Sequence, residues 1–399
     1  MNKLIYISSF IPKKYREDIL KSQKIYDGNS AEVLSRSIFH GLVQNNIDFT
    51  TINISPIGPY PRCNKNIYYE GSITQEEDRD IIDIPFYTLL GYQHYSISIN
   101  VYKTLKTLLC KERSTDLLLY SINISALNAI KRLKAEGYQI RLFLIILDFW
   151  DDMLRTKNFR NRLKSLFIPN VQNYYPLCDG YILLTKEMIN KIDHKSPFCV
   201  VEGMYDSNEE RPKPIIKNNR PKVIFYSGML HEKFGIKQLV EVIHNSDISN
   251  VLLKICGSGD FENQLKEYSR KDSRIQYMGL INRNDVLKEQ YNADILINPR
   301  TADGEFTKYS FPSKTIEYFA SGTPTILHRL PGIPDEYYKY CFTFESSNND
   351  DIKRGIENVL QLSPNRLYQV GIDAQHFIFS NKTSQEQTKK IIDFIKNKK

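Results

Sequence analysis

The chain has 399 residues, a length that is too great for a single hydrophobic core and predicts two domains of ordinary size. Hydrophobic residues make up 41% and charged residues 25%, proportions that exclude a disordered chain and are typical of a globular protein. The formal net charge of +8 is modest for this length, so we expect no nucleic-acid partner.

The sequence carries no sign of export or of a metal site. No apolar run reaches the roughly 20 residues that a membrane-spanning helix needs. The opening MNKLIYISSF holds only a short apolar run, which predicts a buried first strand rather than a secretory signal. The cysteines are scattered and never form a CxxC pair, so we expect reduced thiols in a cytoplasmic protein and no zinc. They are Cys63, Cys110, Cys178, Cys199, Cys256 and Cys341.

The first half of the chain alternates short apolar runs with amphipathic stretches, which predicts a parallel α/β domain. Helices are expected at residues 31–44 and 125–136, and Gly137 ends the second one. The expected strands lie at residues 4–8, 49–54, 117–121, 142–147, 181–185 and 198–201.

Residues 55–73 interrupt this alternation. They hold Pro56, Gly58, Pro59, Pro61 and several tyrosines, and they show no clear periodicity. We expect a long surface loop over the cleft, a usual place for residues that select a substrate. A structureless insertion would give the same pattern.

A second α/β series starts after residues 206–220, which are rich in Asn, Pro and charge and are interpreted as a linker. Its expected strands lie at residues 223–226, 251–256, 275–278, 295–298, 325–327 and 341–344. Two successive series predict two Rossmann-like domains that face each other across a cleft. The domains are expected at residues 1–205 and 221–380, and ligands are expected at the carboxyl ends of the strands. Residues 381–399 are expected to form a helix that packs back on the first domain.

The most informative segment is FPSKTIEYFASGTPTI, at residues 311–326. Ser313 can cap a short helix that Gly322 closes. Lys314 near the start of that helix opposes the helix dipole, which favours a bound anion there. One turn further in, Glu317 can accept hydrogen bonds from the paired hydroxyls of a ribose. The segment therefore predicts a nucleotide-diphosphate site, although an ordinary strand–helix–strand unit with a capped helix fits it too.

This segment resembles the donor site of the retaining glycosyltransferases of family four (glycosyltransferase group 1), which have the GT-B fold. The resemblance is clear over residues 223–344, weaker over 116–203 and absent over 55–100. More narrowly, SFPSKTIEYFASGTP is similar to a branch that acts in bacterial capsule and surface-polysaccharide assembly. The resemblance implies that a sugar passes with retention from a nucleotide-diphosphate donor to a glycan or lipid-linked acceptor. It implies no metal and no cofactor.

The resemblance also assigns donor-binding roles in the second domain. The glycine turn at Gly228 is expected to bring backbone close to a phosphate. Lys233 matches the lysine that holds the donor diphosphate, one residue away from the usual spacing. The usual arginine position is Met229, so we expect Arg300 to supply the guanidinium. The backbone at Leu280 is expected to read the base. Each of these also fits a loop residue without a ligand.

The Glu-x7-Glu signature of this family is incomplete here. Eight positions before Glu317 stands Tyr309, where the family has the glutamate that contacts the donor sugar, and Glu305 could reach in from the preceding loop. The gap leaves open a non-catalytic nucleotide-sugar-binding paralogue or partner subunit. A sugar-nucleotide epimerase of the same fold is a second alternative, which the seven histidines and the lack of a dense carboxylate cluster disfavour.

Three residues of the first domain are expected near the acceptor. Asp148 directly follows a strand, where a carboxylate can orient or deprotonate an acceptor hydroxyl, although a helix N-cap fits equally well. Trp150 could stack on an acceptor sugar, and His94 matches a histidine that many relatives carry; both could instead be structural. Together with Asp148, the catalytic residues would be Lys314 and Arg300, which would stabilise the departing diphosphate.

A basic amphipathic segment follows Trp150. It combines five cations with apolar residues and has no acid among them, so a helix here could lie on an anionic membrane surface. The alternative is a solvated helix whose apolar face packs on the core. A lipid-linked acceptor would favour peripheral membrane contact. The cations are Arg155, Lys157, Arg160, Arg162 and Lys164.

Overall fold

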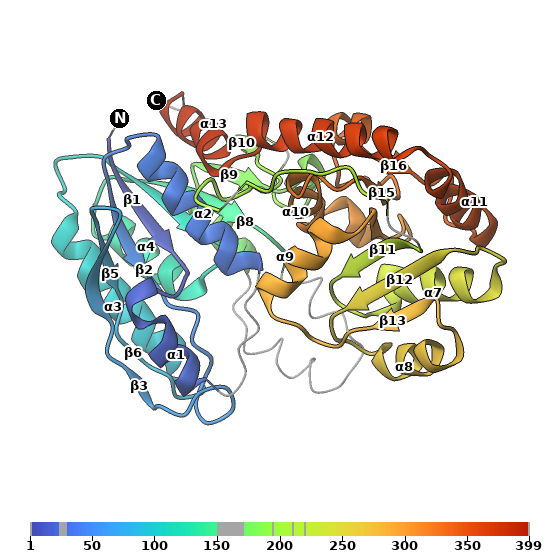
Figure 1. Cartoon of the computed structure of the whole chain (residues 1–399). Coiled ribbons are helices and arrows are strands. Elements are labelled where there is room, and N and C mark those ends of the chain that lie inside the picture. Colours follow the sequence, from blue (N-terminus) through green and yellow to red (C-terminus); the bar gives the residue numbers. More distant parts are fainter. Residues whose placement is uncertain are drawn as a thin grey trace. The chain divides into compact units, whose positions relative to one another are not determined.

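The computed structural model describes residues 2–23, 30–149, 171–193, 195–209, 211–218 and 221–397. The chain divides into two compact units. Unit 1 comprises Met1–Asn208 and Ser384–Lys399, and unit 2 comprises Glu209–Thr383. Each unit is an α/β structure with helices packed around a largely parallel sheet (Figure 1). Trp150 and the basic residues 155–164 lie outside the described residues.

Unit 1 is built on an eight-stranded sheet with the order β10-β9-β8-β7-β1-β2-β5-β4. Neighbouring strands run parallel except β4 and β5, which form an antiparallel hairpin at one edge. A separate two-stranded sheet joins β3 (Tyr68–Tyr69) to β6 (Phe86–Tyr87). The strands of the large sheet are β1 (Lys3–Ser8), β2 (Phe49–Asn53), β4 (Ser72–Glu76), β5 (Arg79–Asp83), β7 (Thr115–Tyr120), β8 (Ile140–Ile146), β9 (Gly180–Leu183) and β10 (Phe198–Val200).

The C-terminal helix of the chain is part of the core of unit 1. Ile391, Ile392 and Ile395 are buried with residues of α2 and of the sheet. The two helices approach so closely that a Cβ on Gly41 would lie 2.2 Å from Thr388 Oγ1, so glycine is required at this crossing. The helices of unit 1 are α1 (Arg16–Ser22), α2 (Ser30–Gln44), α3 (Gln93–Leu108), α4 (Ile124–Ala135) and α13 (Ser384–Lys396), with short 3-10 helices η1 (Lys13–Tyr15), η2 (Val171–Leu177) and η3 (Lys186–Lys191).

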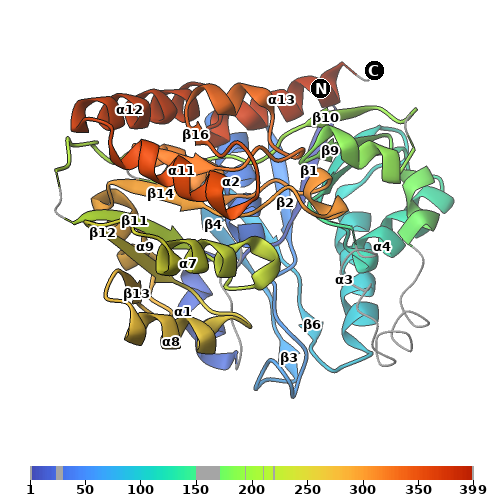
Figure 2. The same ribbon diagram turned by 90° about the vertical axis from the view of Figure 1, so that its right-hand side faces the viewer.

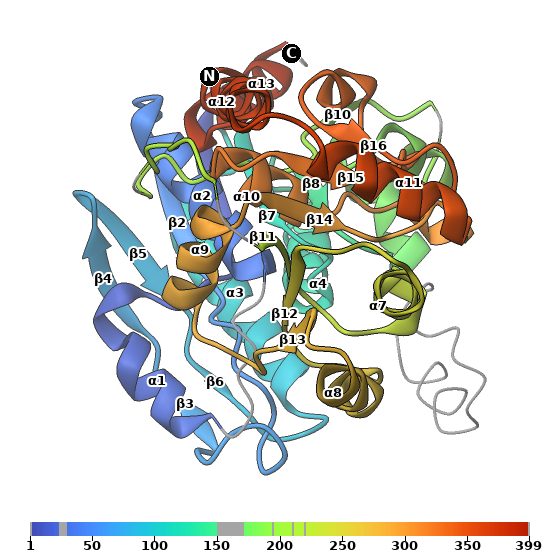
Figure 3. The same ribbon diagram turned by 45° about the vertical axis from the view of Figure 1, so that its right-hand side comes forward.

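Unit 2 has a six-stranded, wholly parallel sheet with the order β13-β12-β11-β14-β15-β16, the strand order of a Rossmann fold (Figure 3). The strands are β11 (Lys222–Ser227), β12 (Val251–Cys256), β13 (Ile275–Tyr277), β14 (Ile295–Asn298), β15 (Thr325–Leu327) and β16 (Phe342–Thr343). The helices are α7 (Ile236–Asn245), α8 (Glu262–Lys271), α9 (Arg283–Asn292), α10 (Lys314–Ala320), α11 (Asn349–Leu360) and α12 (Pro364–Asn381), with 3-10 helices η4 (Glu232–Phe234), η5 (Glu305–Lys308) and η6 (Asp335–Lys339).

The twelve strands expected from the apolar runs are all present, with ends that differ by no more than two residues. The two expected helices are α2 and α4, and Gly137 has the left-handed φ of 90° that follows a helix end. The prediction of one surface loop over residues 55–73 was wrong in part. Its last third enters β3 and β4, and Ser55 and Asn64 are buried. Over the described ranges, every helix is too short or too polar to cross a bilayer.

A buried polar network joins the loop after β2 to the carboxyl ends of β2 and β5. Asp83 is 2% exposed and accepts hydrogen bonds from the Tyr69 hydroxyl, from Ser55 Oγ at 2.9 Å and from Asn53 Nδ2 at 2.9 Å. Burial raises the pKa of the Asp83 carboxyl to about 6, and these neutral donors only partly oppose the shift. The network fixes β3 against the sheet, and among the described residues its hydrogen bonds to Asp83 come from neutral groups.

This network gives a stability prediction with a defined sign. The folded pKa of Asp83 lies above its unfolded value, so its destabilising effect is absent below about pH 4 and is complete above about pH 6. We expect the free energy of unfolding of Asp83→Asn, relative to wild type, to rise by up to about 3 kcal/mol between those pH values. Urea unfolding followed at a series of pH values measures this difference, and a pH-independent difference would contradict it.

Candidate functional site

The strand order of unit 2 reverses between β11 and β14, and such a reversal leaves a crevice at the carboxyl ends of the two strands. Gly228 directly follows β11, and Arg300 comes two residues after the end of β14. Both predicted residues therefore lie at the edge of the sheet where Rossmann folds bind ligands. α10 leads into β15, so its first residue, Lys314, starts from the same edge.

Close backbone contacts shape this edge. A Cβ on Gly257 would lie 1.8 Å from the Gly228 carbonyl oxygen, and Gly257 has a φ of 137°. A Cβ on Gly235 would lie 2.0 Å from the Pro299 carbonyl oxygen. Only glycine allows the two turns to approach in this way. The glycine turn after β12 therefore shapes the edge by packing on the turn at Gly228.

The start of α10 differs from the prediction. Ser313 has helical backbone angles, is exposed and makes no capping hydrogen bond with its side chain, so the prediction that Ser313 caps the helix was wrong. The helix begins at Lys314. A residue needs extended backbone angles to cap with its side chain, and the Thr315 N–H instead donates to the Pro312 carbonyl at 2.9 Å. Gly322 ends the helix with a left-handed φ of 73°, as predicted.

Three side chains hold the Glu317 carboxylate in place. Its Oε1 accepts from Lys314 Nζ at 2.7 Å and from Gln290 Nε2, and its Oε2 lies 3.5 Å from Arg283 Nη1. Gln290 Nε2 also donates to Ser227 Oγ at 3.2 Å, which ties Glu317 to the last residue of β11. The carboxylate is therefore fixed at the carboxyl edge by groups from β11, α9 and α10.

The charge state of Glu317 follows from these contacts. Burial favours the protonated form, since its side chain is only 19% exposed. The Lys314 ammonium, the hydrogen bond from Gln290 and the Arg283 guanidinium outweigh burial and hold the pKa of Glu317 below its usual value. Glu317 is thus an ionised acceptor at neutral pH, which suits it to paired hydroxyl donors.

Lys233 and Arg300 meet around one aromatic ring. Lys233 Nζ lies 5.0 Å from the centre of the Phe234 ring, and the Arg300 guanidinium carbon lies 5.5 Å from the same centre. Arg300 also lies 4.7 Å from the Phe306 ring and donates to Ser310 Oγ at 2.5 Å. The structure thus brings these two predicted cations to the same aromatic ring.

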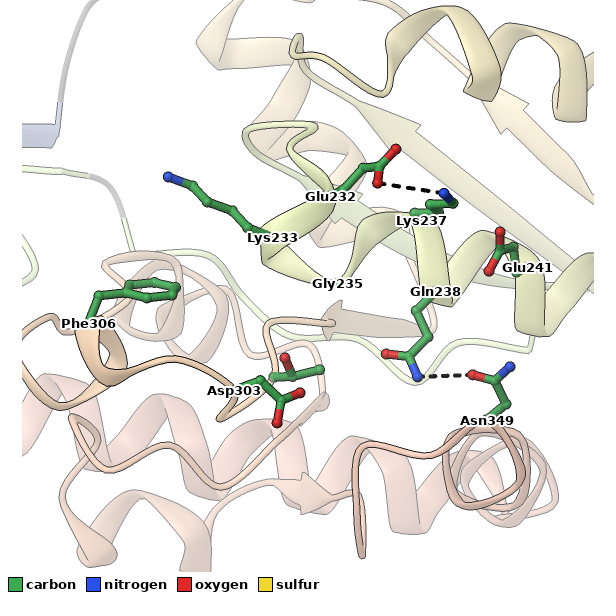
Figure 4. A pocket seen from close by; sticks show the side chains of 10 residues that line it. Glu232, Lys233, Gly235, Lys237, Gln238, Glu241, Asp303, Phe306 and Asn349 are labelled. Atoms are coloured by element: carbon green, nitrogen blue, oxygen red, sulfur yellow. Dashed lines mark hydrogen bonds and ion pairs between the residues drawn. The ribbon is translucent and has the colours of Figure 1, made fainter. Parts of the chain in front are cut away.

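A cavity of about 470 Å³ opens beside these cations. Figure 4 shows Lys233 extending away from Asp303 and Gln238, while Glu232 turns toward Lys237. The walls of the cavity come from η4, α7, the loop after β14, η5 and the first residue of α11. They are Glu232, Lys233, Gly235, Lys237, Gln238, Glu241, Thr301, Asp303, Phe306 and Asn349. Glu317 and Lys314 do not line it.

The remaining predicted donor residues lie around the same edge of the sheet. Leu280 is 79% exposed and follows Gly279, whose carbonyl accepts from the Gly257 N–H at 3.0 Å. Tyr309 is half-buried at the end of η5. Glu305 is exposed at the start of η5, and the structure gives it no contact with Glu317 or Arg300.

The predicted acceptor residues belong to unit 1. Asp148 is exposed, two residues beyond the end of β8. His94 is exposed in the first turn of α3, and its Nδ1 lies 3.2 Å from Ser125 Oγ in the first turn of α4. Both residues therefore lie at the carboxyl edge of the unit 1 sheet.

Gln290 and Arg283 take part in the site but were missed in the sequence. Gln290 is fully buried on α9, one turn after Val286, which packs in the core. A polar residue on the apolar face of a helix was the available signal, since a buried amide needs partners. Among the described residues, no cluster of three His, Cys, Asp or Glu side chains has the arrangement of a metal site.

Comparison with known proteins gives a family match to part of the chain and a fold for the whole of it. Residues 207–373 match the family model described as glycosyl transferases group 1. No curated protein matches the sequence. The match lies almost wholly in unit 2 and covers less than half of the chain.

Solved structures resemble the whole chain. Sucrose-phosphate synthase from Thermosynechococcus elongatus has a TM-score of 0.66 at 12% identity, covering 99% of this chain and 98% of that one. A lipopolysaccharide outer core galactosyltransferase has a TM-score of 0.64 at 14% identity, covering 100% of both chains. The pneumococcal O-GlcNAc transferase, solved with UDP and GlcNAc, has a TM-score of 0.60 at 11% identity, covering 100% and 99%. The chain thus has the GT-B fold of two Rossmann-like domains.

The glycine contacts at this edge lead to a paired prediction. We expect Gly257→Ala to lower the free energy of unfolding by roughly 3 kcal/mol or more, because the methyl group would overlap the Gly228 carbonyl. Gly279→Ala is the control, since Gly279 also has a positive φ but no atom within 4 Å of its Cβ position. It should cost only about 1 kcal/mol. Urea unfolding measures both, and equal losses would contradict the steric account.

Proposed function

We propose that this chain is a retaining, metal-independent glycosyltransferase that moves a sugar from a nucleotide-diphosphate donor to a glycan or lipid-linked acceptor. The observation that carries the proposal is the ionised carboxylate of Glu317, fixed by Lys314, Gln290 and Arg283 at the carboxyl edge of a Rossmann sheet. The family match over residues 207–373 and the UDP-bound neighbour support a nucleotide-sugar donor.

The donor would use the two groups of the site in different ways. Glu317 would accept hydrogen bonds from the ribose hydroxyls, because an ionised carboxylate has two oxygens and no proton to donate. Its Lys314 neighbour would then turn its ammonium to the diphosphate. Arg300 and Lys233, already together at the Phe234 ring, would hold the other phosphate oxygens.

Transfer would depend on charge stabilisation. As the bond from the sugar to the diphosphate breaks, negative charge grows on the leaving phosphate, and Lys314, Arg300 and Lys233 would stabilise it. An acceptor hydroxyl would attack on the same face of the sugar, with Asp148 placed to orient it or to take its proton. We propose a place for this reaction in surface-polysaccharide assembly in the cytoplasm, with residues 155–164 as a basic contact to the membrane.

A non-catalytic nucleotide-sugar-binding protein is the second candidate. Two positions favour it, since Tyr309 stands where the family has a glutamate and Met229, 58% exposed, stands where the family has an arginine. This candidate predicts donor binding without turnover. A sugar-nucleotide epimerase would instead convert the donor without an acceptor.

The donor site is tested by binding and turnover with UDP-, GDP- and dTDP-sugars. We expect one donor to raise the melting temperature and to release nucleoside diphosphate slowly. Glu317→Ala and Lys314→Ala should each weaken donor binding by about tenfold to a hundredfold, because each removes a charge-assisted hydrogen bond. Lys288→Ala, an exposed lysine on α9, is the matched control and should bind as wild type does.

The outcomes separate the candidates. Binding with turnover when glycan or lipid-linked acceptors are added supports the transferase. Binding without turnover of any acceptor supports the non-catalytic protein. If no donor binds the wild-type protein, the proposed site is wrong.

The metal-independent, retaining reaction has its own test. We expect turnover to persist unchanged in excess EDTA, because the cations of the site can replace a metal at the diphosphate. The product, followed by NMR, should keep the anomeric configuration of the donor. Loss of activity that Mg²⁺ or Mn²⁺ restores, or an inverted product, would contradict this part of the proposal.

A further inference from the structure

Unit 1 carries an exposed row of tyrosines that the donor site does not use. The ring centres of Tyr68 and Tyr87 are 4.8 Å apart, those of Tyr87 and Tyr92 are 5.7 Å apart, and those of Tyr92 and Tyr95 are 5.6 Å apart. All four side chains are between 43% and 59% exposed. The turn that carries Leu89 and Leu90 adds two more exposed apolar side chains, and Leu90 is 79% exposed. We call these six residues the tyrosine face. Figure 2 shows its elements, β3, β6 and α3, together at one end of unit 1.

Strand alternation directs the tyrosines outward. β3 and β6 pair so that Tyr68 lies opposite Tyr87 and Tyr69 lies opposite Phe86. Side chains alternate between the two faces of a strand, so the second pair points inward. Phe86 is fully buried, and the Tyr69 hydroxyl donates to buried Asp83. The inward-pointing side chains of Phe86 and Tyr69 therefore anchor the tyrosine face to the interior of unit 1.

Backbone hydrogen bonds hold the face in place. The Tyr87 N–H donates to Ser96 Oγ at 3.0 Å, and the Thr88 N–H donates to the Ile67 carbonyl at 2.7 Å. The Tyr92 N–H donates to the Leu89 carbonyl at 3.0 Å, which closes the turn before α3. The exposed side chains thus need no ligand to order their backbone.

The composition of this surface is unlike the rest of the chain. Residues 84–102 contain no Asp, Glu, Lys or Arg, although these types make up 25% of the sequence. Eight of the thirteen exposed large hydrophobic side chains in the described residues fall between Ile67 and Tyr95. Depletion of charge with enrichment of tyrosine marks a surface that binds a partner.

We infer that the tyrosine face docks unit 1 on the interfacial layer of a lipid bilayer. Tyrosine favours that layer because its ring is apolar and its hydroxyl stays wet. Leu90 at the tip of the turn can enter the acyl boundary. The loop that leads to β3 adds the exposed cations Arg62 and Lys65, which can meet anionic headgroups.

The geometry disfavours a glycan as the occupant. Neighbouring rings in the row are tilted by 49° to 61°, so they offer no common plane on which successive sugars could stack. Leu89 and Leu90 offer nothing to a sugar hydroxyl. A bilayer needs no common plane, because each side chain enters it separately.

Docking of the tyrosine face on a bilayer would bring unit 1 close to a lipid-linked acceptor. β3 and β6 follow the carboxyl ends of β2 and β5, and α3 begins at the same edge, where Asp148 and His94 also lie. The face would thus hold this edge close to the headgroups. The inference does not depend on the donor site, since vesicle binding is measured without nucleotide.

Flotation of the full chain with phosphatidylcholine vesicles, with and without phosphatidylglycerol, tests the inference. We expect wild type to float, and to float more with phosphatidylglycerol. Leu90→Ser and the pair Tyr92→Ser with Tyr95→Ser should each lower the partition coefficient by about tenfold. The pair Arg62→Gln with Lys65→Gln should lower it only when phosphatidylglycerol is present. Ile215→Ser, a variant of a side chain that is 52% exposed in unit 2, is the control and should float as wild type does.

Several results would overturn the inference that the face docks on a bilayer. Equal flotation of wild type and the face variants, or no flotation of wild type, would overturn the inference. Loss of binding to neutral glycans in the tyrosine variants, with vesicle binding unchanged, would also overturn it. So would a change in the oligomeric state of these variants, measured as the mass in solution, with vesicle binding unchanged. Urea unfolding of the same variants shows whether they are folded, so the test of the face stands even if the proposed donor site is wrong.

Discussion

A parallel sheet brings the carboxyl ends of all its strands to one edge, and this constraint governs both units of the protein. In unit 2 the edge gathers Gly228, Arg300 and the start of α10, which are separated by up to 86 residues of sequence, because each follows or precedes a parallel strand. The strand order reverses between β11 and β14, and the backbone turns there pack so closely that Gly257 cannot carry a side chain. Rigid turns at the edge then hold the charged side chains of the site at fixed separations.

Two carboxylates that are largely shielded from solvent show how the surroundings set the charge at such an edge. Both Glu317 and Asp83 lose solvent, which favours the protonated form. Glu317 has Lys314 and Arg283 beside it, and these charges lower its pKa, whereas Asp83 has only the neutral donors Asn53, Ser55 and Tyr69, and its pKa rises. Glu317 is therefore ionised and, in the proposed reaction, free to accept hydrogen bonds from hydroxyls, while the protonation of Asp83 changes near pH 6 and its contacts anchor β3. Burial alone does not distinguish the two roles.

Much of the fold could be predicted from the sequence, since fully buried parallel strands give continuous apolar runs. The β4–β5 hairpin could not, because Glu77 and Asp78 form its turn with left-handed backbone angles of 52° and 58°. Such a turn normally calls for glycine or asparagine, so the usual signal was missing. The prediction that Ser313 caps α10 was also wrong, because capping depends on backbone angles that the residue type does not fix.

The site, too, could be predicted from the sequence only in part. Glu317 and Lys314 could be predicted because they are three residues apart on one helix, where side chains meet by geometry alone. Gln290 and Arg283 come from α9, and only the folded chain shows that they contact Glu317. Lys233 and Arg300 were predicted separately, and their meeting at the Phe234 ring follows from the adjacency of β11 and β14.

Tyr309 stands where the family has a glutamate, and this difference affects which charge of the transition state the protein would stabilise in the proposed reaction. A carboxylate beside the sugar would stabilise positive charge on the ring, and the Tyr309 side chain has no carboxylate. The stabilisation would then fall on the cations at the leaving diphosphate, where negative charge grows. The structure supplies these cations from three separate elements, since Lys314 starts α10, Lys233 belongs to η4 and Arg300 follows β14. Because each has its own contact in the folded protein, the loss of one would leave the others in place.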